Sequence, residues 1–146
     1  MIEPFVITQE DSDVTQTDTT ADSLQDLFVY RVPIGHTIIL RPDDVLCCDL
    51  DETDTTVAQN ICQVKLEVRD ASNEEKKPVL GPLQYASFAA SGVGEFKDED
   101  KSIHLDIHRE MKVYEREYIA LMVKNASPYV DKDTSFFSLR CHRERG

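Results

Sequence analysis

Tryptophan is absent from this chain, and its four cysteines, Cys47, Cys48, Cys62 and Cys141, lack C-x-x-C spacing. The adjacent pair Cys47 and Cys48 would point to opposite faces of a strand. We therefore predict reduced cysteines that serve mainly as packing residues, as free cysteines in proteins usually do.

Long apolar runs are also missing. The longest, Ile119 to Val123, is far shorter than the ~20 residues that a bilayer span requires. The first residues, Met1 to Pro4, carry neither the basic start nor the apolar stretch of a secretory signal. We expect no transmembrane helix, and we expect the protein to be made and used without Sec export.

Basic residues are scarce, because 16 Lys and Arg stand against 28 Asp and Glu, for a net charge of −12. Such a chain repels phosphate backbones and anionic lipid, so nucleic acid and bare membrane are poor partners. Its length of 146 residues suits one domain with its own hydrophobic core.

Short β-rich runs separated by turn residues fill the chain from Leu24 onward, and no long segment keeps a helical period. Residues 61–69 alternate cleanly, which predicts a half-exposed antiparallel strand with Gln63, Lys65, Glu67 and Arg69 on its polar face. Residues 118–123 are apolar on both faces, which indicates a central strand or one covered by a partner. Further strands are predicted at residues 27–32, 37–41, 45–50, 83–90, 102–108, 111–114 and 135–142.

Eight or more evenly spaced strands without a crossover helix predict an all-β fold, an antiparallel β-sandwich. We favour a jelly roll of about eight strands with an extended N-terminal arm. An immunoglobulin-like sandwich is the alternative, although the chain lacks the Cys, Trp, Cys series of antibody domains.

The N-terminal 26 residues hold seven acidic residues and no Lys or Arg. They are predicted to form an acidic extended arm (residues 1–26) before the sandwich domain (residues 27–146). The patch Pro4 to Ile7 could add as a strand to a sheet edge of its own subunit or of a neighbour, or it could be an ordinary first strand.

One group of residues suggests a metal site. His104 and Asp106 would share a strand face, and with His142 they could form a two-His-one-carboxylate metal site, similar to that of iron and 2-oxoglutarate oxygenases. The alternative is a solvated strand face, which needs polar residues at the same positions. Because no nucleophile elbow, phosphate loop or dinucleotide motif occurs, we predict no enzyme and no catalytic, cofactor-binding or metal-ligating residues.

Three segments carry a resemblance to a known family: Phe28 to His36, Leu80 to Phe88, and Ser135 to Leu139. Their succession resembles the small jelly-roll decoration (cement) proteins of tailed-virus capsids. The resemblance implies a structural virion protein that binds the outer capsid surface and bridges capsomers as a homotrimer. The implied partners are the major capsid protein and further copies of the chain, on a virion assembled in the host cytoplasm.

If this is right, Phe5, Val6 and Ile7 anchor the arm, and Tyr118, Ala120 and Met122 face a neighbour. The alternative is that these side chains pack in their own core. A carbohydrate-binding jelly roll is a third hypothesis, with stacking platforms limited to Tyr30, Tyr85, Tyr114, Tyr118 and Tyr129.

Overall fold

Ten strands and one short 3-10 helix make up most of the computed structural model, which describes residues 1–12, 24–52, 61–86, 102–125 and 130–146. In chain order they are β1 (Ile2–Thr8), η1 (Gln9–Asp11), β2 (Gln25–Arg31), β3 (His36–Leu40), β4 (Val45–Glu52), β5 (Ile61–Arg69), β6 (Glu75–Ala86), β7 (Ser102–His104), β8 (Met111–Val113), β9 (Tyr118–Asn125) and β10 (Val130–Arg145). In the described part of the chain, no helix has the length and apolar character needed to cross a bilayer.

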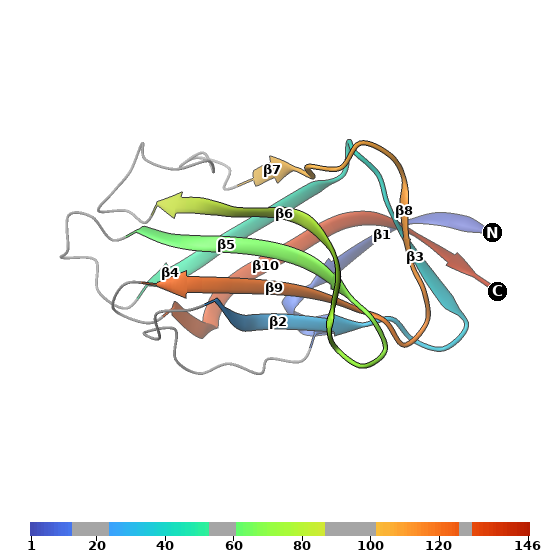
Figure 1. Cartoon of the computed structure of the whole chain (residues 1–146), viewed down its shortest axis with the longest axis horizontal. Coiled ribbons are helices and arrows are strands. Elements are labelled where there is room, and N and C mark those ends of the chain that lie inside the picture. The colour runs from blue at the N-terminus through green and yellow to red at the C-terminus, as the bar shows by residue number, and fades with distance from the viewer. Residues whose placement is uncertain (13–23, 53–60, 87–101, 126–129) are drawn as a thin grey trace.

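The strands form two antiparallel sheets that lie face to face (Figure 1). The first sheet has the order β7-β4-β10-β3-β8, with β1 also paired to β10, and the second has the order β2-β9-β5-β6. β10 is long enough to pair with β4 through residues 130–139 and with β3 through residues 142–145, while β1 lies on its other side. β3 and β4 therefore run end to end as one interrupted strand, and β8 and β7 flank them in the same way.

If β3 with β4 and β7 with β8 are each counted as one strand, the ten strands become eight, numbered here in chain order. The first sheet then has the order first, eighth, third, sixth, and the second has the order second, seventh, fourth, fifth. Two interlocked Greek keys of this kind define the jelly roll. The predicted all-β class, antiparallel sandwich and jelly-roll topology are confirmed.

The interruption between β3 and β4 has a local cause in the turn from Arg41 to Asp44. The carboxylate of Asp44 accepts a hydrogen bond from the backbone N–H of Arg41 at 2.7 Å, and the backbone N–H of Asp44 donates to the carbonyl of Arg41 at 3.0 Å. Asp44 is buried, and this burial raises the pKa of its carboxyl group. Leu105, beyond the end of β7, donates its N–H to the carbonyl of Asp44 at 3.0 Å. The predicted strand over residues 102–108 therefore ends at His104.

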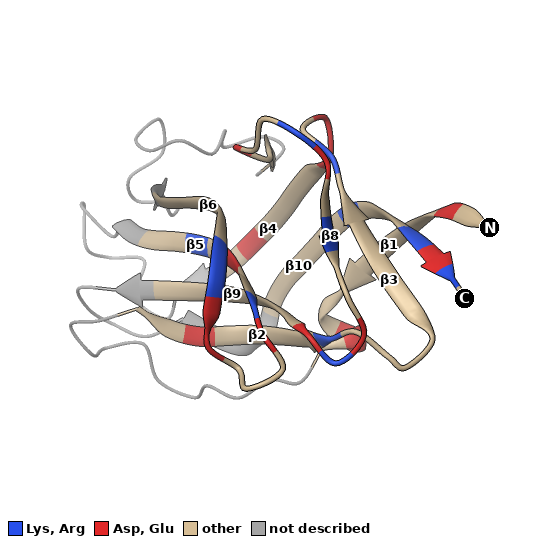
Figure 2. Cartoon of the chain, turned by 45° about the vertical axis from the view of Figure 1, so that its right-hand side comes forward, with Lys and Arg blue, Asp and Glu red and all other residues tan. Residues whose placement is uncertain are grey.

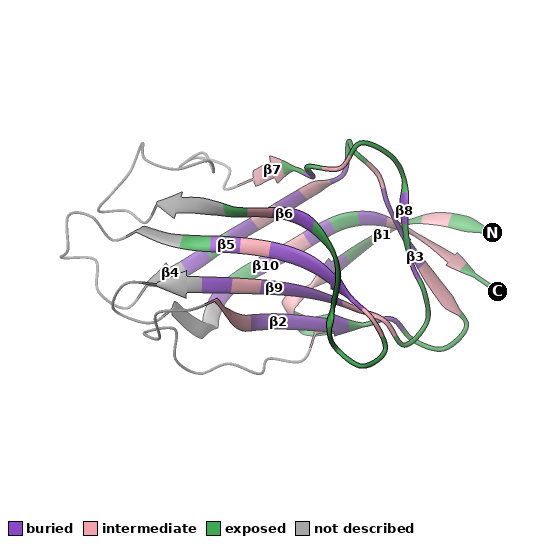
Figure 3. Cartoon of the chain, viewed as in Figure 1, coloured by how far each residue is buried: buried purple, intermediate pink, exposed green. Residues whose placement is uncertain are grey.

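One hydrophobic core fills the space between the sheets (Figure 3). The rings of Phe28 and Phe137, one from each sheet, stack with centroids 5.7 Å apart at its centre. The strand faces that alternation predicted to point into the core are buried where the structure describes them, for example at Val64, Leu66 and Val68 of β5.

The turn between β2 and β3 depends on Gly35, whose φ is +86°. Residues with a Cβ atom are strained in that conformation. The hydrogen bond from His36 N to Pro33 O, 3.1 Å long, closes this turn.

The predicted arm is described only in part, since residues 13–23 lie outside the described residues, as do residues 87–90 of the strand predicted over 83–90. Residues 2–8 of the arm pair with β10 of the same chain as β1, and Gln25 and Asp26 belong to β2. The boundary between arm and sandwich at residue 26 stays a prediction.

Candidate interaction surfaces

β1 is an edge strand, because among the described residues it pairs only with β10. Ile2 lies opposite Glu144, and the N–H of Arg145 donates to the carbonyl of Met1. This register makes Ile2, Pro4, Val6 and Thr8 the non-hydrogen-bonded positions, whose backbone groups face away from β10.

Two features blunt this free edge against a further strand. Pro4 has no N–H to donate, and the N–H of Thr8 already donates to the Asp11 carboxylate at 2.9 Å. Only the N–H groups of Ile2 and Val6 remain on this edge as donors to a further strand. Strand addition along its whole length would therefore lack half of its main-chain donors.

Charged side chains hold β1 against β10. One carboxylate oxygen of Glu3 accepts hydrogen bonds from Arg143 Nη2 at 2.7 Å and from Arg145 Nε at 2.9 Å. The hydrogen bond from Arg143 holds the pKa of Glu3 below its ordinary value, although partial desolvation opposes it. The Arg143 guanidinium also lies 4.2 Å from the centre of the Phe5 ring. This cation–π contact adds to the attachment of β1.

Three exposed apolar side chains lie on the outer face of the first sheet: Ile2 and Val6 of β1, and Phe136 of β10. Their exposed fractions are 48%, 49% and 44%, respectively. Val6 pairs directly with Arg140, and Phe136 lies four residues before Arg140, so both side chains leave the same face. We call this surface the β1–β10 face.

The predicted arm anchors differ in their surroundings. Val6 is exposed, Phe5 is half-buried and packs against the core, and Ile7 is fully buried within the core of its own chain. Contact of these three residues with a partner stays a prediction.

The outer face of the second sheet carries a buried ion-pair network. Figure 2 marks the positions of basic and acidic residues along its strands. Arg69 of β5 donates to both carboxylate oxygens of Asp26 on β2, one of them at 2.9 Å, and to Glu67 at 2.8 Å. Lys65 continues the network to Glu67 at 3.1 Å and to Glu75 at 3.0 Å.

The prediction of a half-exposed polar face for residues 61–69 is therefore wrong at two positions, since Glu67 is 4% and Arg69 is 5% exposed. The hydrogen bonds that Arg69 donates to the Asp26 carboxylate raise the pKa of its guanidinium above its already high ordinary value. Asn73, in the turn after β5, accepts a further hydrogen bond from Arg69 at 3.1 Å.

The second set of predicted partner residues lies on this same face. β9 is the central strand between β2 and β5, as one of the two interpretations of its apolar faces predicted. Ala120 is fully buried, and Tyr118 and Met122 are half-buried. Ala120 pairs with Glu67 on one side, so its small side chain leaves room for the network that crosses β9. Contact of these residues with a neighbour stays a prediction.

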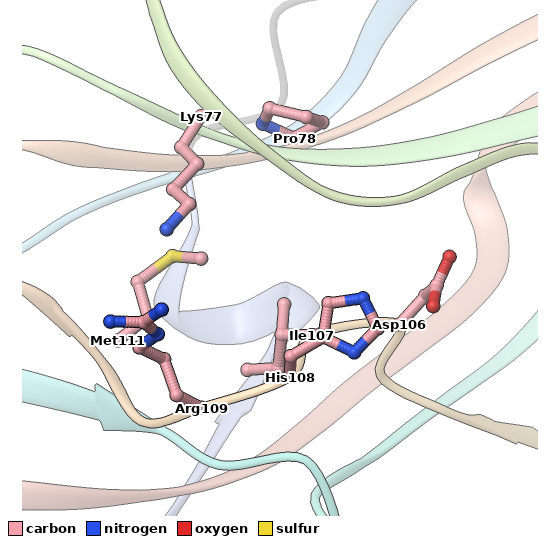
Figure 4. Close-up of a pocket in the computed structure, with 7 residues that line it drawn as sticks. All are labelled: Lys77, Pro78, Asp106, Ile107, His108, Arg109 and Met111. Atoms are coloured by element: carbon pink, nitrogen blue, oxygen red, sulfur yellow. The ribbon is translucent and has the colours of Figure 1, made fainter.

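A pocket of about 300 Å³ lies between the start of β6 and the loop that joins β7 to β8 (Figure 4). Lys77 extends from β6 toward the loop, which contributes Asp106, His108 and Arg109. Three apolar side chains complete the lining: Pro78, Ile107 and Met111. We call it the Lys77–Arg109 pocket. Sequence reasoning missed it, because its two walls are about 30 residues apart in the chain.

The structure does not bring His104, Asp106 and His142 together as a metal site. His104 and Asp106 are exposed, as the alternating pattern predicts, while His142 lies on β10 with Arg41 Nη1 3.5 Å from its Nε2. Over the described ranges, no group of three or more His, Cys, Asp or Glu side chains could hold a metal ion. The oxygenase alternative thus lacks its ligand set.

The described tyrosines form no flat platform for a sugar. Tyr30 is buried, which raises its pKa to about 12. Lys76 Nζ lies 5.5 Å from the ring centre of the exposed Tyr114. The Arg31 guanidinium lies 5.6 Å from the ring centre of the half-buried Tyr118. The side chains of Tyr85 and Tyr129 lie outside the described residues.

The described cysteines are thiols that form no disulfide, as predicted. Cys48 and Cys141 are buried and Cys47 is half-buried, whereas the side chain of Cys62 lies outside the described residues. Burial raises the pKa of the Cys141 thiol to about 12. Cys48 and Cys141 therefore act as packing residues.

No family model matches the chain, and no curated protein matches its sequence. Among solved structures, the chain is similar to VP17, a capsid protein of bacteriophage P23-77, with a TM-score of 0.53 and 6% identity over 100% of this chain and 97% of that chain. It is also similar to the VP16–VP17 complex, a complex of the two major capsid proteins of bacteriophage P23-77, with a TM-score of 0.50, 7% identity and full coverage of both chains. At these identities, the likeness concerns the fold.

Proposed function

We propose that this chain is a structural protein of a virus particle. The observation that carries the proposal is the jelly roll that spans the chain and matches a bacteriophage capsid protein along nearly the whole length of both chains. Fold alone does not determine function, so the surfaces must also suit assembly. The exposed apolar side chains of the β1–β10 face and the Lys77–Arg109 pocket offer contact sites.

The finer proposal is that of a decoration protein. Such a protein would bind the outer surface of a tailed-virus capsid and bridge capsomers as a homotrimer, with the major capsid protein as its partner. Support comes from the resemblance of residues 28–36, 80–88 and 135–139 to decoration proteins and from the net charge of −12, which suits a partner with basic patches. Assembly would take place in the host cytoplasm, and the protein would remain on the capsid surface.

A shell-forming capsid protein is the second candidate. The specific observation in its favour is the similarity to a complex of two proteins that are themselves major capsid proteins. The two roles differ in what remains when the protein is removed, because a shell survives the loss of its decoration but not of its building block.

In either role, contacts of β1 with a neighbour would involve side chains more than backbone pairing. Pro4 and the Thr8–Asp11 hydrogen bond blunt the free edge, and Ile7 faces inward, whereas Val6 is exposed on the β1–β10 face. Met122 and Tyr118, both half-buried, could contribute from the second sheet. Many identical weak contacts of this kind add up in a closed shell or a symmetric oligomer.

Light scattering of the purified chain tests self-assembly. The expected result is a mass three times that of the chain, which the substitution Val6→Glu reduces to that of a monomer. The control Ile34→Glu changes another exposed aliphatic side chain, in the turn before β3, and is expected to leave the mass unchanged. A monomer at every concentration would contradict the homotrimer.

Mass spectrometry of purified particles from the virus that encodes the chain tests the virion role itself. The protein is expected in stoichiometric amounts, and its absence would refute the proposal. Mild denaturant then separates the two roles: release that leaves intact shells supports a decoration protein, and release that dissolves the shell supports a shell-forming protein.

A further inference from the structure

The Lys77–Arg109 pocket brings together side chains from two distant parts of the chain. Lys77 lies at the start of β6, and Asp106, His108 and Arg109 lie in the loop before β8 (Figure 4). Lys77, His108 and Arg109 are all exposed to solvent. A ligand can therefore enter without movement of the core.

The cations of this pocket have no partner in the described part of the chain. Lys65, Lys76 and Arg69 each form ion pairs with carboxylates, whereas no hydrogen bond or ion pair of Lys77 or Arg109 joins them to another described residue. Other exposed cations of the described residues, such as Lys112 and Arg140, also lack an ion pair, but Lys77 and Arg109 line one pocket together. An external carboxylate is the group that suits them.

The remaining lining favours a peptide over a small inorganic anion. Asp106 would repel a free anion, but its carboxylate can accept a hydrogen bond from a peptide N–H. Pro78, Ile107 and Met111 supply apolar surface for the stem of a side chain. Apolar lining with a few polar groups that fix the orientation of a ligand is typical of binding pockets.

We propose that the Lys77–Arg109 pocket binds the acidic N-terminal segment of a second copy of this chain. Residues 8–26 carry six acidic residues, including Asp13, Asp18 and Asp22, and no Lys or Arg. Each copy brings one pocket and one acidic segment, so the contact is heterologous and can link copies around a symmetric assembly. This inference rests on the proposed function only in that an assembling protein meets further copies of itself.

Fluorescence anisotropy with a labelled peptide of residues 8–26 and the full chain tests the pocket. At low ionic strength the peptide is expected to bind. Lys77→Ala or Arg109→Ala should each weaken binding about two- to fivefold, the range of an ion pair between exposed side chains, and salt should weaken it further. Lys112→Ala, on the neighbouring strand β8 but outside the pocket, is the matched control and should bind like the parent.

Three results would overturn the proposal: no binding, equal binding of a peptide with Asn and Gln in place of its acids, or equal binding to the Lys77→Ala/Arg109→Ala variant. A second form of the chain, with Asn at positions 13, 18 and 22, removes competition from its own segment. If the parent chain is a monomer in light scattering, peptide binding that appears only in this form would mean that the contact lies within one chain. If the parent is an oligomer, the same result would support the proposal, because the segments of neighbouring copies then compete for the pockets. None of these results alters the particle test above, so the two proposals can fail separately.

Discussion

Substitution of Arg69 by methionine probes the ion-pair network on the second sheet. The guanidinium of Arg69 connects Asp26 on β2 with Glu67 on its own strand, across the central strand β9. Methionine keeps much of the length and apolar surface of the side chain but removes the charge. Asp26 and Glu67 then remain as two carboxylates without their shared cation.

The expected cost follows from burial. The side chains of Arg69 and Glu67 are 7% and 6% exposed, and removal of one partner from a buried pair costs about 3–5 kcal/mol. Asp26 is 27% exposed and Glu67 keeps Lys65 at 3.1 Å, so we expect the lower end, about 3 kcal/mol. For a domain of this size, that loss lowers the Tm by roughly 6–12 °C.

Urea unfolding followed by circular dichroism measures this loss, with the slope m as a check that the unfolded state is unchanged. Arg31→Met is the matched control, because the exposed Arg31 makes a cation–π contact with Tyr118 and should lose less than about 1 kcal/mol. Combining Arg69→Met with Asp26→Asn and Glu67→Gln should recover at least about 1 kcal/mol of the loss, since the uncompensated charges are gone. A loss below about 1 kcal/mol for Arg69→Met, or no recovery in the combined variant, would refute the reasoning.

Three further predictions concern β1, the cysteines and one turn. Because Arg143 lowers the folded-state pKa of Glu3, the stability from this contact is present above the ordinary carboxylate pKa and is lost as the pH falls through the folded value; amide exchange in β1 should rise there, and Glu3→Gln should abolish this pH dependence. Iodoacetamide should modify Cys47 and spare Cys141, which is fully buried and has a pKa of about 12, and mass spectrometry showing equal labelling would contradict this. Gly35→Ala should destabilise the fold by about 1 kcal/mol in urea unfolding, because of its φ of +86°; its Cβ would be 3.8 Å from the nearest atom, so an unchanged stability would mean that the turn relaxes.

Local patterns were sufficient for the presence of most strands and for their described inward faces, but not for all bounds: β6 begins at Glu75 rather than at residue 83, and β7 ends at His104. The alternation over residues 61–69 correctly predicted the strand and its buried Val64, Leu66 and Val68. It failed on Glu67 and Arg69, because their burial depends on Asp26, which is about 40 residues away in the chain and reaches Arg69 only across β9. Alternation relates residues two positions apart, such as Glu67 and Arg69, but it carries no information on the bond from Arg69 to Asp26 on another strand.

Candidate sites were harder to predict, because a functional site requires side chains from distant parts of the chain to lie close together. His104 and Asp106 are both exposed, but β7 ends at His104, so they do not share a strand face, and His142 does not join them. Lys77 and Arg109 share no motif, yet they line one pocket. Among the predicted contact residues, only Val6 is exposed, while Ile7 and Ala120 are buried within the chain. Whether they face a partner depends on assembly and stays a prediction.

By itself, the sequence determined the all-β class, the sandwich, the main strands and the described core faces, because side-chain alternation and turn residues act over a few neighbouring positions. It also determined the acidic charge and the lack of a membrane-spanning helical segment. The tertiary structure decided which strands pair, how β10 joins β1, β3 and β4, and which polar groups become buried. Those outcomes depend on contacts between residues far apart in the chain, and a local sequence pattern does not predict the free energies of such contacts.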